Sequence, residues 1–371
     1  MKILVLSSLS KSLINFRGPL IQSFVDKGHE VIAAGPDYNA YVNDVLSRMG
    51  VQYEIYHLQR TGTNLLSDIK SYNSLKKLIN KVQPDLVLSY TIKPVIYGSY
   101  AAKRLKVPKI YSMITGLGNA FNNTTSLKSS YLSCITEFLY KASLKNTDGV
   151  IFQNPDDRDV FVEKDIIQKG KAFRIYGSGV DIDEFAFSEP VFNPVTFLFI
   201  GRLLKEKGIN DFIEAARIIR KKYSDTRFLV VGGLDNNPTS YSISDFKEFH
   251  DSGLIEFIGR VKDVKPYIKQ SSIFVLPSYY GEGTPRTGLE AMSMGRPLIM
   301  TDSVGCRETV KDGLNGFLVP IKNPNKIAQA MEKFIIDPNL ITHMSKESRR
   351  FAEEVYDVSK VNKEICKILG L

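Results

Sequence analysis

The chain has 371 residues, 43% of them hydrophobic, which suffices for two domains of ordinary size, each with its own core. Its three cysteines are far apart and lack the spacing of a metal site, which excludes a disulfide-rich secreted protein and predicts a reducing, cytoplasmic setting. The net charge is +9, and residues 1–145 carry 18 Lys and Arg against 8 Asp and Glu, a net +10, so the remainder is close to neutral. No nucleic-acid-binding module accompanies this charge, and no nucleic acid partner is expected.

The first half of the chain alternates strand-like and helix-like segments. Short apolar runs predict strands at residues 2–7, 30–35, 52–57, 85–90, 109–113 and 149–153. Helical periodicity predicts helices at residues 13–27, 39–49, 66–82 and 95–105. Such alternation is typical of a doubly wound α/β domain with a parallel sheet. The loop after the first strand is serine-rich at residues 8–12 and lacks G-x-G-x-x-G, which argues against a dinucleotide-binding enzyme.

The second half repeats this alternation from Val195 to Pro320. Residues 183–194 contain two prolines and few strong helix or strand formers, so they are interpreted as the linker between the halves. Residues 323–371 are predicted to be helical. We therefore expect one α/β domain over residues 1–185 and a second over residues 186–355.

A basic loop follows the first strand of the second half. The predicted strand Val195–Ile200 is followed by the sequence GRLLKEKGINDF and then by an amphipathic helix. Arg202 and Lys207 therefore belong to a loop at the carboxyl end of a strand, where α/β sheets usually bind ligands. Arginine offers a planar fork of donors and lysine a point charge, a combination suited to a diphosphate, although a solvated basic loop is the alternative.

Two carboxylates lie in the next glycine-rich stretch, YGEGTPRTGLEAMSMGRPLIMTDSVGCR. A strand-like run at residues 272–278 precedes Glu282, and a helix-compatible run at residues 287–294 contains Glu290, eight residues further on. The amino end of that helix is suited to an anion. Carboxylates on either side of a bound phosphate can hold hydroxyls, which indicates a nucleotide sugar. Taken alone, the pair could also be a loop carboxylate and a solvated helix residue.

These two segments together resemble the family-4 retaining glycosyltransferases of the GT-B fold, and the resemblance extends over most of the chain. Supporting stretches are GSGVDIDEF, FLVVGG, FIGRVKDV and NGFLVP. INFRGPLI and TGLGNAF in the first half resemble the branch that builds bacterial surface polysaccharides and lipid-linked oligosaccharides, and within it the undecaprenyl-diphosphate-dependent α-N-acetylgalactosaminyltransferases. The resemblance implies two Rossmann-like domains that face a cleft, with a C-terminal helix at residues 356–371 that packs back on the first domain.

The resemblance also implies roles for individual residues. The expected catalytic residues, which neutralise the donor diphosphate or hold the donor sugar, are Arg202, Lys207 and Glu282. The expected donor-binding residues are Glu290, Thr287, Gly288, Leu289, Gly259, Arg260, Val261, Gly283 and Thr284. No cofactor and no metal requirement are expected. Asp181 and Asp183 have D-x-D spacing, but in VDIDEF they are expected to cap the interdomain segment.

On the acceptor side the chain departs from the family pattern. Serines replace the glycine pair that many members have in the first loop, and the region where many members have a histidine near the donor sugar reads TGLGNAF. We expect the residues that line the acceptor site to be Arg17, Arg60, Thr115, Gly116 and Asn119. Arg17 and Arg60 would contact the acceptor's diphosphate, unless they belong to structural ion pairs. No general base is identified.

The function implied by the resemblance is that of a retaining hexosyltransferase. It would move a sugar, N-acetylgalactosamine or another hexose or hexosamine, from a UDP-sugar to an undecaprenyl-diphosphate-linked saccharide in O-antigen, capsule or related glycan assembly. The alternatives are a GT-B-fold isomerase or epimerase of nucleotide sugars and a non-catalytic binder of sugar nucleotides.

The basic first half also favours a peripheral location at the inner face of the plasma membrane. The apolar run at residues 3–6 is too short for a signal peptide, and no later segment reaches roughly 18 uninterrupted apolar residues, the length needed to span a bilayer. Attraction to anionic lipid contributes about 1 kcal/mol for each basic residue near the surface. The stretch at residues 127–144 is either a helix that lies on the membrane or an ordinary half-buried helix.

Overall fold

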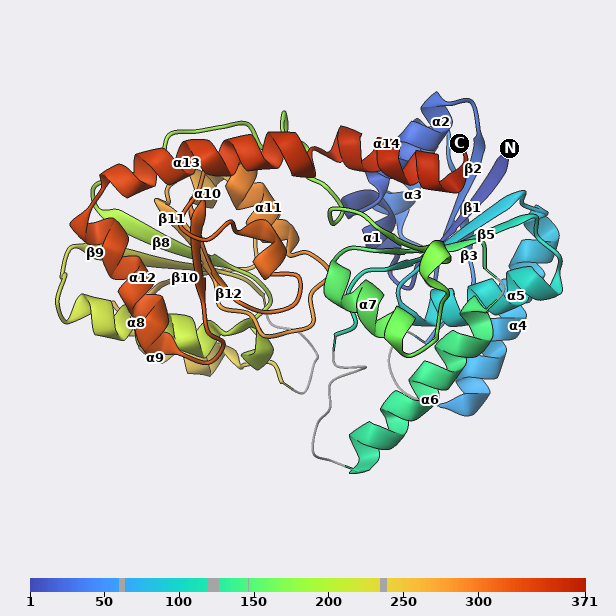
Figure 1. The fold of residues 1–371 in the computed structure, drawn as a ribbon, viewed down its shortest axis with the longest axis horizontal. Helices are drawn as coiled ribbons and strands as arrows, with labels where there is room; N and C mark the ends of the chain where they lie inside the picture. Colours follow the sequence, from blue (N-terminus) through green and yellow to red (C-terminus); the bar gives the residue numbers. More distant parts are fainter. Residues whose placement is uncertain (60–63, 119–126, 146, 234–238) are drawn as a thin grey trace. The chain divides into compact units, whose positions relative to one another are not determined.

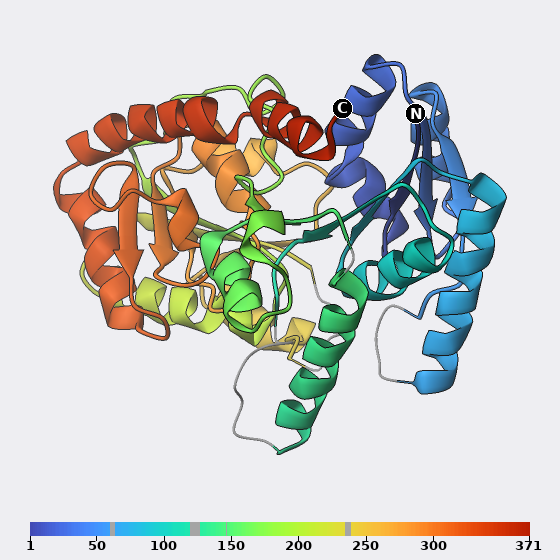
Figure 2. The same ribbon diagram turned by 45° about the vertical axis from the view of Figure 1, so that its right-hand side comes forward.

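A computed structural model describes residues 1–59, 64–118, 127–145, 147–233 and 239–371. The chain forms two compact units, the first from Met1–Ser178 and Ser359–Leu371, the second from Gly179–Val358. Each unit contains one parallel sheet flanked by helices (Figure 1, Figure 2). This is the pair of doubly wound α/β units predicted from the sequence.

The first unit has a seven-stranded sheet in the order β3-β2-β1-β4-β5-β6-β7. Its strands are β1 (Lys2–Leu6), β2 (Glu30–Gly35), β3 (Gln52–Ile55), β4 (Leu86–Tyr90), β5 (Lys109–Ile114), β6 (Gly149–Phe152) and β7 (Ala172–Arg174). Its helices are α1 (Ser10–Asn15), α2 (Gly18–Asp26), α3 (Ala40–Arg48), α4 (Leu65–Val82), the π-helical η1 (Pro94–Gly98), α5 (Ser99–Arg104), α6 (Leu127–Leu144), α7 (Pro155–Glu163), the short η2 (Lys169–Lys171) and α14 (Val358–Leu369).

Both faces of this sheet are buried, which the sequence of β1 illustrates. Alternate residues of a strand point to opposite faces of its sheet. Ile3 and Val5 accordingly belong to one hydrophobic cluster, with α1 and α2, while Leu4 and Leu6 belong to another, with α4 and α5. A strand covered on both sides reads as a continuous apolar run, as KILVL does.

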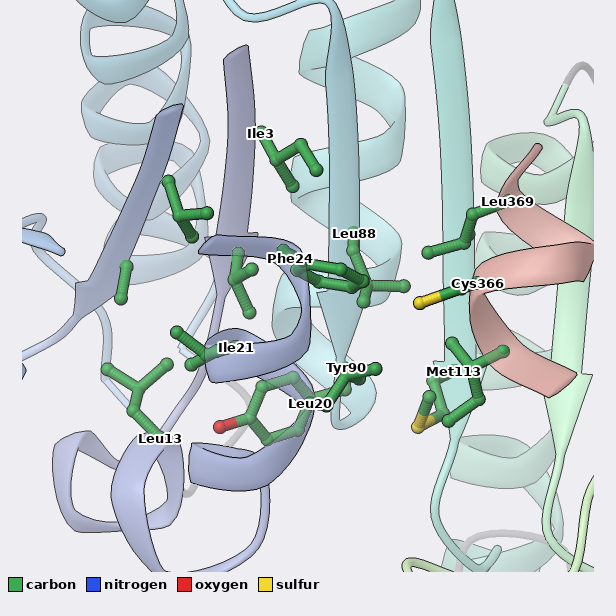
Figure 3. Close-up of a cluster of buried hydrophobic side chains, with 14 of the residues drawn as sticks. Ile3, Leu13, Leu20, Ile21, Phe24, Leu88, Tyr90, Met113, Cys366 and Leu369 are labelled. Carbon is green, nitrogen blue, oxygen red and sulfur yellow. The ribbon is translucent and has the colours of Figure 1, made fainter. Parts of the chain in front are cut away.

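Helix α14 returns to the first unit, as the resemblance implied. Its residues Val361, Ile365, Cys366 and Leu369 are buried in the cluster that contains Phe24 (Figure 3). These four positions follow the i, i+4, i+5, i+8 spacing of one helix face. The last residues of the chain are therefore part of the core that begins at β1.

One local prediction in the first unit was wrong, and one short strand was missed. The helix expected at residues 13–27 is two helices, α1 and α2, with the break at Phe16 and Arg17. Pro19, at the start of α2, has no N–H to donate to a preceding turn, so one continuous helix would lose a hydrogen bond there. Strand β7 was not predicted, because three residues are too few to show a period.

The second unit has a six-stranded parallel sheet in the order β10-β9-β8-β11-β12-β13. Its strands are β8 (Val195–Ile200), β9 (Thr226–Val231), β10 (Glu256–Gly259), β11 (Ile273–Leu276), β12 (Leu298–Thr301) and β13 (Gly316–Val319). Its helices are the short η3 (Lys205–Lys207), α8 (Ile209–Arg220), α9 (Ile243–Asp251), α10 (Lys265–Lys269), α11 (Arg286–Ser293), the short η4 (Arg307–Thr309), α12 (Pro324–Ile336), α13 (Asn339–Phe351) and the π-helical η5 (Ala352–Tyr356).

The segment expected to be a linker is tied to the second unit by two arginines. The Arg349 guanidinium donates to the carbonyl oxygens of Ile182 at 3.0 Å and Phe185 at 3.2 Å. Arg296, which is fully buried, donates to the carbonyl oxygen of Ser188 at 2.6 Å and to its hydroxyl at 2.7 Å. Asp181 caps the start of this segment, as expected, because its carboxylate accepts from the N–H groups of residues 183 and 184 at 3.0 and 2.8 Å.

Candidate functional site

The loops after β8 and β11 lie side by side at the carboxyl edge of the second sheet. Strand β8 pairs with β9 on one side and with β11 on the other, so the chain's winding direction reverses between β8 and β11. Ligands of open α/β sheets bind at such a switch point. The loop after β8 contains Arg202 and Lys207, and the loop after β11 contains Glu282, so the fold brings the two segments singled out from the sequence together.

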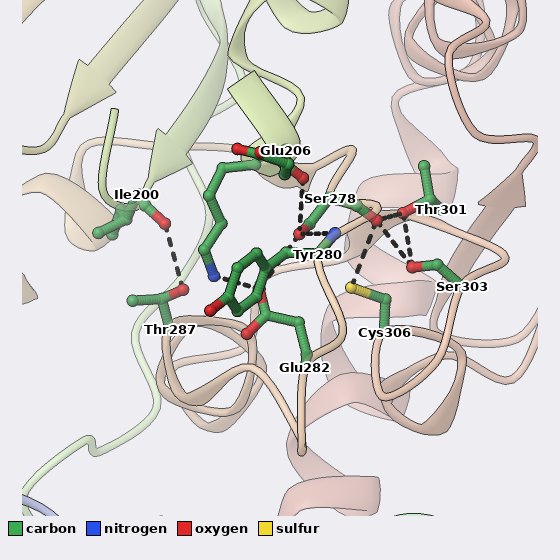
Figure 4. Close-up of polar contacts among 10 residues, drawn as sticks. Ile200, Glu206, Ser278, Tyr280, Glu282, Thr287, Thr301, Ser303 and Cys306 are labelled. Atoms are coloured by element: carbon green, nitrogen blue, oxygen red, sulfur yellow. Dashed lines mark hydrogen bonds and ion pairs between the residues drawn. The ribbon is translucent and has the colours of Figure 1, made fainter. Parts of the chain in front are cut away.

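Lys207 and Glu282 form an ion pair across these two loops (Figure 4). Both side chains are largely buried, with 12% and 13% of their surfaces exposed. Removing charge from water strengthens the attraction within such a pair and makes the loss of either partner costly. The pair therefore fixes the Lys207 loop against the Glu282 loop.

Ser278, just after β11, connects both loops to the sheet. Its hydroxyl lies 3.1 Å from Glu282 Oε1 and 3.3 Å from the carbonyl oxygen of Glu206. Its carbonyl oxygen accepts from the hydroxyls of Thr301 and Ser303, the latter at 2.7 Å, at the end of β12 (Figure 4). Three loops are thus joined around one fully buried serine.

Two glycines permit the close approach of these loops. A Cβ on Gly208 would lie 2.0 Å from the carbonyl oxygen of Pro277, and one on Gly305 would lie 2.5 Å from that of Glu282. Both glycines also have positive φ, +75° and +77°. Any other residue at these positions would displace the backbone next to the ion pair.

The ring of Tyr280 lies among the cations of the site. The guanidinium carbon of Arg202 is 5.8 Å from the ring centroid, and the Lys207 ammonium nitrogen is 5.6 Å from it. An aromatic face attracts cations at such distances. The backbone N–H of Tyr280 is bonded to the carbonyl oxygen of Glu206 at 3.0 Å, which holds the ring over the basic loop. Tyr280 was not predicted, and sequence spacing gives no signal for it.

Helix α11 begins at the same edge and contains the second carboxylate. The hydroxyl of Thr287 donates to the carbonyl oxygen of Ile200 at 3.2 Å, which attaches the first turn of α11 to the end of β8 (Figure 4). The N–H groups of Gly288 and Leu289 donate to the carbonyl oxygen of Pro285 at 3.0 and 3.2 Å. These two amides, expected to face a diphosphate, have an acceptor within the helix turn in this structure.

Glu290 is nearly inaccessible, with 7% of its surface exposed. Arg286 Nε donates to its Oε1 at 2.8 Å, one helical turn earlier. Burial raises the pKa of Glu290, and Arg286 opposes this change. Arg286 was not among the predicted site residues, although the i, i+4 spacing of an arginine and a glutamate could have indicated the contact.

The remaining predicted donor-side residues lie along the same edge. Gly259 ends β10 with φ of +80°, and its carbonyl oxygen accepts from the N–H of Gly232 at 3.0 Å. The exposed Arg260 and half-buried Val261 follow it, in the loop after β10, which is separated from β8 by β9. Gly283 and Thr284 follow Glu282 in the β11–α11 loop and are buried and half-buried.

The predicted acceptor residues that the structure describes belong to the first unit. Arg17 is buried, and its guanidinium carbon lies 5.3 Å from the centroid of the Tyr90 ring at the end of β4. Thr115 and Gly116 directly follow β5, and Gly116 has φ of +114°. Arg60 and Asn119 lie outside the described residues.

Two features are absent from the described part of the chain. No helix in it is both long and apolar enough to cross a membrane. No three His, Cys, Asp or Glu side chains in it are grouped so that they could hold a metal ion.

Comparisons with known proteins match both halves of the chain. Residues 181–351 match the family model described as glycosyl transferases group 1, and residues 2–154 match the one described as glycosyl transferase 4-like. The chain is 27% identical to the N,N'-diacetylbacillosaminyl-diphospho-undecaprenol alpha-1,3-N-acetylgalactosaminyltransferase of Campylobacter jejuni, over 99% of this chain and 98% of that protein.

Two further relatives support this relationship. The chain is 28% identical to the UDP-Gal:alpha-D-GlcNAc-diphosphoundecaprenol alpha-1,3-galactosyltransferase of Escherichia coli, over 80% of this chain and 78% of that one. Among solved structures, HepE of Anabaena in complex with UDP and glucose shares the fold, with a TM-score of 0.79 and 18% identity over 100% of this chain and 99% of that one. The chain therefore belongs to the family-4 glycosyltransferases and has their GT-B fold.

Proposed function

We propose that this glycosyltransferase moves a sugar from a UDP-sugar to an undecaprenyl-diphosphate-linked saccharide, with retention of configuration and without a metal ion. The sugar that we favour is N-acetylgalactosamine, with another hexose or hexosamine as the wider class, and the linkage formed is α. The proposed acceptor class is supported by two relatives. The names of the Campylobacter jejuni and Escherichia coli proteins each include a saccharide linked to diphosphoundecaprenol. The Staphylococcus aureus relative, 26% identical over 98% of this chain and 95% of that one, is named as a capsular polysaccharide biosynthesis glycosyltransferase.

The observation that carries the proposal is the cluster of Arg202, Lys207, Tyr280 and Glu282 at the switch point of the second sheet. It places two cations and a carboxylate where an open α/β sheet binds its ligand. A sugar diphosphate offers phosphate oxygens to the cations and hydroxyls to the carboxylate. This match of chemistry supports nucleotide-sugar binding at this edge.

In the proposed reaction, the bond between the sugar's anomeric carbon and the diphosphate breaks, and a new bond forms from that carbon to an acceptor hydroxyl oxygen. The hydroxyl gives up its proton, so UDP and a proton are the other products, and negative charge develops on the leaving phosphate. Arg202 and Lys207 neutralise that charge, the Arg202 fork through paired N–H groups and the Lys207 ammonium as a point charge. Preorganised donors of this kind typically contribute several kcal/mol to the rate. The ion pair with Glu282 keeps Lys207 in place before the donor binds.

The two glutamates then hold different parts of the donor. Glu282 accepts hydrogen bonds from hydroxyls of the sugar, and Glu290 accepts them from the ribose. The backbone at Gly259–Val261, with Arg260 between them, contacts the base, and the amide of Thr287 contacts the diphosphate. Gly283 and Thr284, beside Glu282, contact the sugar. For the amides of Gly288 and Leu289 to contact the diphosphate as well, their hydrogen bonds to the carbonyl oxygen of Pro285 would have to break.

For the acceptor we propose the first unit, with Arg17, Arg60, Thr115, Gly116 and Asn119 as its contacts.

An anionic membrane surface is the proposed location, because residues 1–145 carry 18 Lys and Arg against 8 Asp and Glu. Helix α6 also exposes Phe138, with 70% of its surface accessible. Sedimentation with vesicles of anionic lipid tests this location: binding that decreases in Phe138→Ser and in high salt supports it.

Calorimetry with UDP, GDP, UDP-N-acetylgalactosamine, UDP-galactose and GDP-mannose tests the donor site. Each ligand is measured with the wild type, with Lys207→Ala and with Lys205→Ala. Lys205 is an exposed lysine of the same short helix, which makes it the matched control. We expect UDP and one UDP-sugar to bind the wild type and Lys205→Ala equally, and to lose most of their affinity in Lys207→Ala.

The other outcomes bear on different parts of the proposal. Binding of GDP in place of UDP would leave the site in place and overturn the choice of nucleotide and of N-acetylgalactosamine. Equal binding to Lys207→Ala would overturn the diphosphate role. Product analysis with a diphosphate-linked acceptor then separates transfer from isomerisation: a converted free nucleotide sugar, without transfer, would overturn the transferase activity of this chain.

A further inference from the structure

The carboxylate of Glu290 is buried, which disfavours its negative charge, and it is paired with the guanidinium of Arg286. The carboxylate is buried in α11, and Arg286 Nε donates to Oε1 at 2.8 Å from the first turn of the same helix. Arg286 itself is partly exposed, with 32% of its side chain accessible. A buried carboxylate stays ionised only when a positive charge or several hydrogen bonds compensate for its desolvation.

Two other carboxylates, from neighbouring elements, act on the charge of Glu290. Glu184, from the turn that Asp181 caps, and Asp263, from the loop between β10 and α10, both act to raise the pKa of Glu290. Lys265 offsets part of their charge. Its ammonium lies 3.3 Å from Glu184 Oε1, and its backbone N–H donates to Asp263 Oδ1 at 3.0 Å. Arg286 acts in the opposite direction, through both its charge and its hydrogen bond.

We propose that Arg286 is a positioning residue of the donor site, which keeps the Glu290 carboxylate ionised and fixed so that it can accept hydrogen bonds from the ribose hydroxyls of a nucleoside diphosphate. This inference rests on the proposed role of Glu290 in donor binding. It assigns a role to an arginine that directly precedes the predicted Thr287 and was not among the predicted site residues. An ionised carboxylate accepts two charge-assisted hydrogen bonds, whereas its protonated form has lost one acceptor position to a proton.

A pH dependence follows from this arrangement. Without the guanidinium, burial, Glu184 and Asp263 act on Glu290 unopposed, so its pKa rises further and the carboxylate is protonated at a higher pH than in the wild type. Binding of the ribose then requires that the proton be released. The affinity lost on removal of Arg286 should therefore be largest at low pH and should be regained as the pH increases.

Calorimetric titration of UDP into the full-length protein, with GDP in parallel, tests this inference between pH 6 and pH 9. For Arg286→Gln we expect UDP affinity on the order of tenfold below the wild type at pH 6, about the effect of losing one hydrogen bond to a charged group, with the difference shrinking towards pH 9. Titrations in two buffers of different ionisation enthalpy should show more protons released on binding than in the wild type. Subtracting the wild-type values removes the titration of UDP itself.

Matched variants separate this role from others. Arg286→Lys keeps the charge and should restore much of the affinity at pH 6. Arg217→Gln removes an arginine paired with Glu214 on α8 and should leave UDP binding unchanged at every pH. In a Glu290→Gln background, Arg286→Gln should add no pH-dependent loss, because the group that it acts on no longer titrates.

Several results would overturn the inference. A loss of affinity in Arg286→Gln that is the same at every pH would mean that the arginine contacts the nucleotide itself. No loss at any pH would mean that it has no part in binding. Full UDP affinity in Glu290→Gln would mean that neither Glu290 nor Arg286 takes part in UDP binding. The proposed transferase function would still stand. A wild type that binds neither UDP nor GDP would instead overturn the proposed function.

Discussion

The Ser278 hydroxyl lies 3.1 Å from Glu282 Oε1, the carboxylate oxygen that the Lys207 ammonium also contacts. Ser278 is fully buried, and its carbonyl oxygen accepts from Thr301 and Ser303 (Figure 4). A side chain held this firmly fixes the carboxylate that it contacts. The geometry of the ion pair therefore depends on the contacts of Ser278 at the ends of β11 and β12, as well as on the two residues that form the pair.

Replacement of Ser278 by alanine should lower kcat more than it changes donor KM. The hydroxyl provides a hydrogen bond to a charged group, and its loss leaves Glu282 and Lys207 free to move together away from the reacting position. We expect kcat to fall about tenfold, which corresponds to about 1.4 kcal/mol. Steady-state kinetics with the UDP-sugar identified by calorimetry measures this effect.

Ser271→Ala is the control for this prediction. Ser271 is equally buried, lies just before the same strand β11, and donates to the carbonyl oxygen of Ile268 at 2.8 Å, at the end opposite the site. Both variants should lower the melting temperature similarly, and only Ser278→Ala should lower kcat. Equal loss of kcat in the two variants would show that Ser278 acts through stability alone.

Asp157 should make the stability of the first unit depend on pH. Burial raises the pKa of Asp157 to about 7 from an ordinary value of 3.8, although Asn154 and the backbone of Leu117 donate hydrogen bonds to it. The native state therefore holds a proton between about pH 4 and pH 7 that the unfolded state has released. Protonated Asp157 therefore adds at most about 4 kcal/mol to the free energy of unfolding. This contribution is fully present below pH 4 and is lost as the pH rises through 7.

Asp157→Asn removes this titration and keeps the size of the side chain. The unfolding free energy of the wild type relative to the variant should decrease as the pH rises from 4.5 to 8, measured by urea denaturation at each pH. Asp159→Asn, an exposed position on the same helix α7, should show a difference that does not change with pH. A flat profile for Asp157→Asn would contradict the buried, protonated state.

Sequence patterns predicted six of the seven strands of the first sheet, and β8 and β11 of the second, but not how distant loops meet. Strand β11, expected at residues 272–278, is confirmed at Ile273–Leu276, because four consecutive apolar residues between a serine and a proline give a clear local signal. The pairing of Lys207 with Glu282, by contrast, joins residues 75 positions apart in the sequence. Local periodicity contains no information on such a contact, and the resemblance to a family suggested both residues without predicting that they touch.

The missed contacts have a common cause. Arg286 lies one turn before Glu290, so spacing alone could have indicated that they interact, but the burial of Glu290 depends on the packing of α11 against the sheet. Ser278 reads as the end of a strand, and Tyr280 as a loop aromatic. What makes each of them part of the site is the meeting of the β8 and β11 loops at the switch point, which is a property of the sheet order.

Ile365→Ala should destabilise the first unit and leave the donor site intact. Ile365 is buried on α14, in the same hydrophobic cluster as residues of β1 and β4. Deletion of a buried isoleucine side chain down to Cβ costs about 2–5 kcal/mol. Hydrogen exchange should increase in β1 and β4, while UDP affinity, which depends on the second unit, stays as in the wild type. Lys363→Ala, an exposed position on the same helix, should change neither.

Arg296→Met should destabilise the second unit strongly, because Arg296 joins three separate segments from inside the core. Its guanidinium donates to the carbonyl oxygens of Ile268 at 2.8 Å, Ser188 at 2.6 Å and Met294 at 3.0 Å. Burial lowers the pKa of Arg296 to about 10, so the side chain is still charged at neutral pH. Methionine fills a similar volume but leaves these buried oxygens without donors, each at a cost of about 1–3 kcal/mol.

Arg296→Lys distinguishes the effect of the charge from that of the fork. Lysine keeps a positive charge, but its single ammonium cannot reach acceptors on three segments at once. We expect thermal denaturation to show a large decrease in melting temperature for both variants, with lysine only partly protective. Arg350→Met, at a partly exposed arginine paired with Glu347, should change the melting temperature little. If Arg296→Met melts like the wild type, the attachment of residues 188–189 to the second unit does not depend on this arginine, and other contacts must hold the segment.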